Sequence, residues 1–102
     1  MRFTVHAHRI ELTDELYRLI DNRLHFALSR LEPHIGHVHV YLRDEDGPRG
    51  GIAERCRLRT HLADKELIVE RTHSDIRSAI SAASDRLGDA ARRTLARQLE
   101  RR

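Results

Sequence analysis

The feature that most constrains the fold is a long amphipathic stretch near the C-terminal end of this 102-residue chain. Its apolar residues recur every three or four positions, the spacing that places them on one face of a helix. They are Ile76, Ile80, Ala83, Leu87, Ala90 or Ala91, and Leu95. A helix with so long an apolar stripe must pack against another element, so the rest of the chain has to provide an apolar surface. We expect Ser74 or Asp75 to cap its first turn.

Three arginines lie along one flank of the same stripe. Arg93 and Arg97 follow Arg86 by seven and eleven residues, offsets that return to nearly the same angle around a helix. A guanidinium is a planar, permanently charged fork that suits phosphate groups. The spacing therefore predicts a helix flank that binds RNA or DNA. The alternative is solvated surface charge, which an arginine-rich composition gives whatever the function.

Charge is distributed unevenly along the chain. Lysine and arginine total 19, and aspartate and glutamate total 16, which gives a formal net charge of +3. From Arg86 onward there are six arginines and two acidic residues, whereas three acidic residues in a row occupy 44–46. A chain of this length fits one domain, 1–102, with a modest core. We expect the basic and the acidic cluster to lie at opposite ends of that domain.

Four segments alternate apolar and polar residues, as strands with one buried face do. Their inward residues are expected to be Phe3, Val5 and Ala7; Val38, Val40 and Leu42; Cys56, Leu58, Thr60 and Leu62; and Leu67 and Val69. Between the first two strands, a helix is expected to begin after Thr13 as its N-cap and to end at Pro33 and Gly36. Its inner face comprises Leu16, Ile20, Leu24, Ala27 or Leu28, and Leu31. The segment 44–51 is expected to be a loop.

The order of these elements is β-α-β-β-β-α, which predicts an α+β fold. A strand–helix–strand unit crosses over right-handed and leaves its two strands parallel, while the following strands pair antiparallel. Each strand has one apolar face, so both helices must cover the same side of a four-stranded mixed sheet. The predicted architecture is a two-layer sandwich whose other sheet face is open to solvent and lined with histidine and arginine.

Two motifs resemble a known family. Residues 10–16, Ile-Glu-Leu-Thr-Asp-Glu-Leu, followed by Arg23 and Leu24 within the first helix, resemble the opening motif of the ribosome hibernation-promoting factor family, also called ribosome-associated inhibitor A proteins. Residues 75–87 resemble the final helix of that family, because the pairs Asp-Ile and Ala-Ile and the triplet Asp-Arg-Leu recur in them. The element order and the length agree as well, so the resemblance covers essentially the whole chain.

The resemblance implies a fold like that of double-stranded RNA-binding domains. It also implies a protein that docks in the tRNA and mRNA channel of the small ribosomal subunit, blocks initiation and helps to store ribosomes when growth slows. Basic residues of the two helices contact ribosomal RNA in that family, and the matching positions here are Arg23 and Arg86. Arg93 and Arg97 lie near further basic positions of the second helix. The chain ends soon afterwards, as in the short form that lacks a C-terminal dimerisation domain.

Several features depart from the family pattern. The last helix carries arginines where the family usually has lysines, and Asp89 stands about where the family often has a basic residue. Gly88 is expected to interrupt the helix, at a cost of about 1 kcal/mol relative to alanine. The glycine-rich loop around Arg49 is longer than expected, and this arginine could reach a phosphate with help from nearby backbone amides.

The sequence leaves two alternative functions open. Two His-x-His pairs would place four imidazoles on the open face of adjacent strands, where zinc or copper could bind. The pairs are His6 with His8 and His37 with His39. Tyr41 and Ile68 on the same face could instead serve a small protein-interaction module.

A second basic surface lies on one strand. Arg55, Arg57 and Arg59 alternate on a single strand face. They could bind RNA from the sheet side, or pair with Glu66 and Glu70 across a hairpin. We favour pairing for at least one of them.

An enzyme is not predicted, because no nucleophile elbow or comparable spacing assembles the serine, histidine and aspartate residues. The single cysteine, Cys56, is expected to be a small core residue. No apolar run is long enough for a signal peptide or a membrane span, so we expect a cytoplasmic protein. It should repress translation by binding the RNA of the small ribosomal subunit, with no cofactor, membrane or small-molecule substrate. The expected RNA-binding residues are Arg23, Arg86, Arg92, Arg93 and Arg97.

Overall fold

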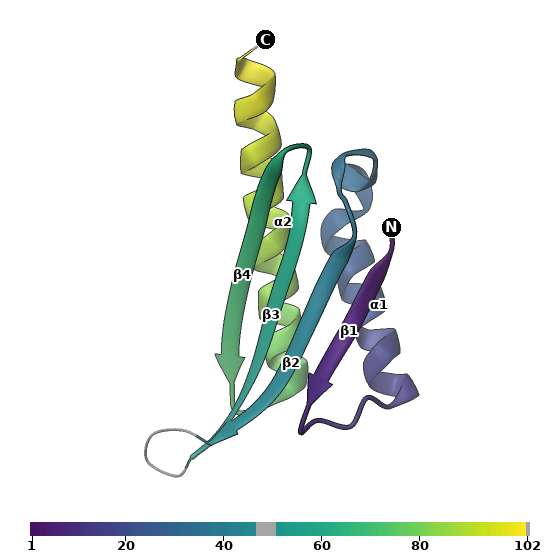
Figure 1. Ribbon diagram of the computed structural model, residues 1–102, viewed down its shortest axis with the longest axis vertical. Coiled ribbons are helices and arrows are strands. Elements are labelled where there is room, and N and C mark those ends of the chain that lie inside the picture. Colours follow the sequence, from purple (N-terminus) through teal and green to yellow (C-terminus); the bar gives the residue numbers. More distant parts are fainter. Residues whose placement is uncertain (47–50, 102) are drawn as a thin grey trace.

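The computed structural model describes residues 1–46 and 51–101, and its elements follow the predicted order (Figure 1). In addition to two helices and four strands, it contains one short 3-10 helix, η1. The elements are β1 (Phe3–His8), α1 (Asp14–Leu28), η1 (Ser29–His34), β2 (Val38–Asp46), β3 (Ile52–Leu62), β4 (Lys65–His73) and α2 (Ile76–Glu100).

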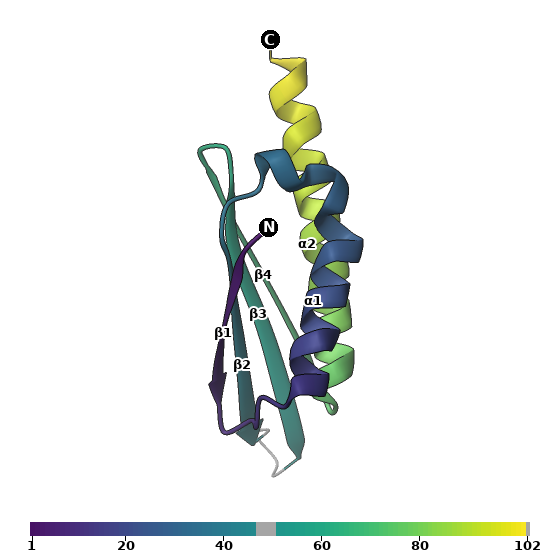
Figure 2. The same cartoon turned by 90° about the vertical axis from the view of Figure 1, so that its right-hand side faces the viewer.

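The strands form one mixed sheet in the order β1-β2-β3-β4. β1 and β2 are parallel, with Phe3 opposite Val38, and the other two pairs are antiparallel. Both helices lie on the same face of this sheet, and the other face is uncovered (Figure 2). The predicted α+β two-layer sandwich is therefore confirmed.

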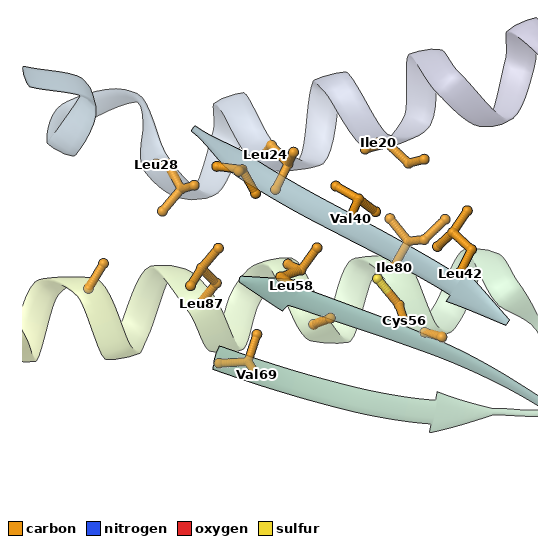
Figure 3. Close-up of a cluster of buried hydrophobic side chains, with 14 of the residues drawn as sticks. Ile20, Leu24, Leu28, Val40, Leu42, Cys56, Leu58, Val69, Ile80 and Leu87 are labelled. Atoms are coloured by element: carbon orange, nitrogen blue, oxygen red, sulfur yellow. The ribbon is translucent and has the colours of Figure 1, made fainter. Parts of the chain in front are cut away.

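The core lies between the helices and the sheet, where side chains from both layers point toward one another (Figure 3). Leu24 and Leu87 from the helices and Leu58 from β3 are almost completely buried there. Thr60 is the polar exception that the alternation predicts, and its hydroxyl donates to the carbonyl of His37 at 3.0 Å. Burial of a hydroxyl is tolerated when it keeps a hydrogen bond, so Thr60 fits an inward position.

The helix caps agree with the sequence. The Thr13 side chain accepts a hydrogen bond from the Leu16 amide at 3.1 Å. Asp75, one of the two predicted caps, accepts from the Arg77 amide, and Glu54 of β3 accepts from the Ile76 amide at 3.0 Å. The start of α2 is thus tied to the sheet as well as capped.

Two boundary predictions and one burial prediction were wrong. α1 ends at Leu28 instead of continuing to Pro33, because Pro33 has no N–H to donate to the carbonyl of Ser29 and its ring clashes with that carbonyl. The chain tightens into η1, which still buries Leu31. β2 continues through residues 44–46, which were expected in a loop, because they pair with β3. Ala7, near the end of the edge strand β1, is exposed. The predictions for residues 47–50, including Arg49, lie outside the described residues.

Gly88 does not interrupt α2, which is continuous from Ile76 to Glu100. The two helices run in the same direction (Figures 1 and 2), and at this point they approach closely. A Cβ atom on Gly88 would lie 3.0 Å from the carbonyl oxygen of Ala27 and 3.3 Å from its Cβ. The glycine is therefore a contact residue whose missing side chain lets α1 and α2 pack against each other.

This contact predicts the effect of a large side chain at the same position. Gly88→Leu should force the helices apart and lower the free energy of unfolding by about 1–3 kcal/mol, the usual cost of overpacking. Ala96→Leu, at an exposed position of the same helix, is the matched control and should change it by less than about 0.5 kcal/mol. Urea denaturation followed by circular dichroism measures both. Equal stability of the two variants would contradict the proposed role of Gly88.

Candidate nucleic-acid interface

The arginines that the helical spacing brings together form what we call the basic ridge, Arg86, Arg93 and Arg97. Arg86 is half-buried, and the other two are exposed. Gly88 faces α1. Arg86 precedes it by two residues, and Arg93 and Arg97 follow it by five and nine, offsets that point to nearly the opposite side of a helix. The ridge therefore lies on the side of α2 away from α1. Among the described residues, no carboxylate lies within ion-pair distance of any of the three.

The other two predicted residues do not join this ridge. Arg92, four residues after Gly88, lies on the α1 side of the helix and forms an ion pair with Asp89. Arg23 lies in a groove between the two helices, together with Ser81 and Asp85. The five predicted arginines therefore divide into two sets on either side of α2.

A residue that the sequence did not single out stands beside Arg92. Phe26 is 79% exposed, and with Arg30 and Arg92 it lines a hollow of about 500 Å³. An exposed aromatic ring between cations can stack on a nucleobase, whose phosphates the guanidiniums would hold. The signal was available in the sequence, because Phe26 is a large apolar residue two positions from Leu24, opposite the inner stripe of α1.

The uncovered face of the sheet carries a row of rings. The ring centroids of His6 and Tyr41 are 4.8 Å apart, those of His6 and His39 5.7 Å, and those of His37 and His39 4.9 Å. The Nε2 atom of His37 forms a hydrogen bond with the Thr4 hydroxyl at 2.7 Å. Across the described part of the chain, no three His, Cys, Asp or Glu side chains converge as metal ligands would. The His-x-His pairs share a face as predicted; His6 stacks on His39, and the rings of His37 and His39 are tilted by 48°.

The surroundings of two titratable groups alter their pKa values. Burial lowers the pKa of His39, and the nearby His37, Arg59 and His6 lower it further. Burial raises the pKa of Cys56 to about 12, which keeps its thiol protonated. Cys56 is fully buried in the core, as predicted.

The arginines of β3 differ in their partners. Arg55 forms ion pairs with Glu45 at 2.8 Å and with Glu70 at 3.4 Å. This confirms that at least one of the three arginines pairs across a hairpin. Arg57 is exposed, and Arg59 lies 5.9 Å from the centroid of the Tyr41 ring. Neither forms an ion pair within residues 1–46 and 51–101, so both guanidiniums remain available on the open face.

Comparison with known proteins identifies relatives over nearly the whole chain. The family model described as Sigma 54 modulation protein / S30EA ribosomal protein matches residues 3–102. A ribosomal subunit interface protein from Coxiella burnetii has a similar structure, with a TM-score of 0.80, 12% identity, and coverage of 94% of this chain and 99% of that one. The N-terminal domain of Protein Y from Thermus thermophilus gives a TM-score of 0.72, 21% identity, and coverage of 92% and 99%. No curated protein sequence gives a significant match.

No helix in the described ranges is long and apolar enough to cross a membrane.

The lowered pKa of His39 predicts a pH dependence of stability. Below an ordinary pKa of 6.5 the unfolded chain binds more protons at this position than the folded chain. The free energy of unfolding should therefore fall as the pH drops through 6.5 toward the lowered folded-state pKa. His39→Gln should weaken this dependence, which urea titrations above and below pH 6.5 would measure.

The same titrations test the contribution of the neighbouring guanidinium. Arg59→Gln removes one positive charge beside His39, so the pH dependence should shrink. Arg71→Gln, at an exposed position of β4, is the matched control and should leave it unchanged. A His39→Gln variant with the pH dependence of the wild type would contradict the assignment.

Proposed function

The chain belongs to the Sigma 54 modulation protein / S30EA ribosomal protein family, and we propose that it binds the RNA of the small ribosomal subunit and thereby represses translation. Proteins of this family are ribosome-associated regulators of translation, not enzymes. The family match bears out the resemblance to hibernation-promoting factors in the two helix motifs.

The observation that supports this proposal is the basic ridge of Arg86, Arg93 and Arg97. A rise of 1.5 Å per residue separates these arginines by about 10 Å and about 6 Å along the axis of α2. The helix fixes these spacings, and none of the three guanidiniums is neutralised by a described carboxylate. Guanidiniums held this way suit the phosphates of a folded RNA, since the positions are fixed before binding. Arg23, Arg92 and Phe26 would extend the contact on the α1 side of the helix.

We infer that the domain, 1–102, occupies the channel that tRNA and mRNA use on the small subunit. Its elongated shape, with extents of 50 × 29 × 18 Å, suits a channel more than a flat surface. Occupying that channel excludes initiation by steric competition, which requires no catalytic group. The Coxiella relative is itself described as a ribosomal subunit interface protein.

The proposal is tested by reversing charge on the basic ridge. Arg86→Glu combined with Arg93→Glu should reduce co-sedimentation with small ribosomal subunits at least tenfold, because two phosphate contacts become repulsive. Arg2→Glu combined with Arg9→Glu is the matched control, since both residues are exposed and flank β1 at the opposite edge of the sheet. The control should sediment like the wild type. Equal loss in both double variants would show that net charge, and not the ridge, determines binding.

The salt dependence of binding gives a second test. Each arginine that neutralises a phosphate releases counterions, so log K should fall linearly with log salt concentration. Arg86→Ala combined with Arg93→Ala should lower the magnitude of that slope by roughly two, about one for each arginine. An unchanged slope would mean that the ridge does not contact phosphates. Fluorescence titrations of labelled protein with ribosomes at several salt concentrations provide the measurement.

A further inference from the structure

We propose that the open face of the sheet is a second RNA-binding site, which holds a single-stranded segment by stacking its bases on aromatic rings. This site lies on the side of the sheet opposite α1 and α2 (Figure 2). It is independent of the basic ridge, so the protein would bind two RNA segments on its two faces.

The rings of the open face are arranged as a stacking surface. His6, His39 and Tyr41 project from the neighbouring parallel strands β1 and β2. The planes of His6 and Tyr41 differ by 14°, those of His6 and His39 by 20°, and those of His39 and Tyr41 by 24°. Rings that stack on one another cover their facing sides, but His6 is exposed at the outer side of the row. A base can extend the stack there whatever its sequence.

Cations flank the rings where phosphates would lie. The Arg59 guanidinium lies over the Tyr41 ring, and the exposed Arg57 is the next outward residue of β3. Both are free of ion pairs in the described part of the chain, in contrast to Arg55. Two available guanidiniums beside a row of rings give the combination of charge and stacking that unpaired nucleic acid requires.

The shape of the face also suits a nucleotide. A hollow of about 530 Å³ lies there, and His6, Tyr41, Arg43, Arg55 and Arg57 contribute to its lining. Its volume is within the range of sites that bind small molecules. It therefore has room for a base and its sugar phosphate between the rings and the guanidiniums.

The chemistry of the face favours RNA over other occupants. A protein partner would need an apolar patch, and among the described residues Ile68, 46% exposed, is the one large aliphatic residue exposed on this face. Duplex RNA would keep its bases paired and stacked away from the rings, so a single strand is the form that fits.

The experiment measures binding of a short oligouridine, labelled with fluorescein at one end, by fluorescence anisotropy. Tyr41→Ala should weaken binding about tenfold, the usual effect of removing one stacking ring. Tyr41→Phe is the matched control and should bind like the wild type, because it keeps the ring. Arg57→Gln combined with Arg59→Gln should weaken binding and reduce its salt dependence. Circular dichroism of each variant verifies the fold.

The two RNA sites are separated by combining variants. Tyr41→Ala should have the same tenfold effect when introduced into the Arg86→Glu and Arg93→Glu background, whereas ribosome co-sedimentation should depend on the ridge substitutions. Equal binding by Tyr41→Ala and the wild type would overturn the inference without affecting the ribosome proposal. Uridine monophosphate provides the last comparison. If it competed as well as unlabelled oligouridine at the same concentration of nucleotides, the inference would also be overturned, because the site would then take a free nucleotide instead of a strand.

Discussion

The packing of both helices on one apolar face of the sheet determines the rest of the structure. Successive side chains of a strand point to opposite faces of the sheet, so burying one set leaves the other set in water. Hydrophobic burial of residues such as Leu24, Leu58 and Leu87 therefore also fixes which polar residues share the open face. The close contact of Ala27 with Gly88 sets the rotation of α2 against α1, and with it the direction in which the arginines of α2 point.

Periodicity in the sequence was sufficient to predict the architecture, because two amphipathic helices and four one-sided strands in this order allow few arrangements. The ends of the helices and strands were harder to predict. The acidic residues 44–46 read as a loop by composition, yet they continue β2, since cross-strand ion pairs such as Glu45 with Arg55 satisfy their charges. That pairing depends on the register of two strands, which no local pattern contains.

The candidate site was predictable to a similar extent. Seven- and eleven-residue spacing identified the ridge of Arg86, Arg93 and Arg97, because helical geometry alone places them on one flank. The spacing did not indicate that Arg92 pairs with Asp89, or that Arg23 lies in the groove between the two helices. Those placements depend on side-chain rotamers and on how one helix is rotated against another. The stacking of His6, His39 and Tyr41 likewise follows from the β1–β2 register, even though their shared face was evident from the alternation.

The last turns of α2 extend beyond the sheet and α1 (Figures 1 and 2). A bare helix with its side chains is about 10–12 Å across, whereas the whole domain measures 50 × 29 × 18 Å. The projecting end can therefore enter a crevice too narrow for the two-layer body, and the body then limits how deep it goes. In the proposed complex, the length of the projecting end would therefore limit how far Arg97 enters the RNA.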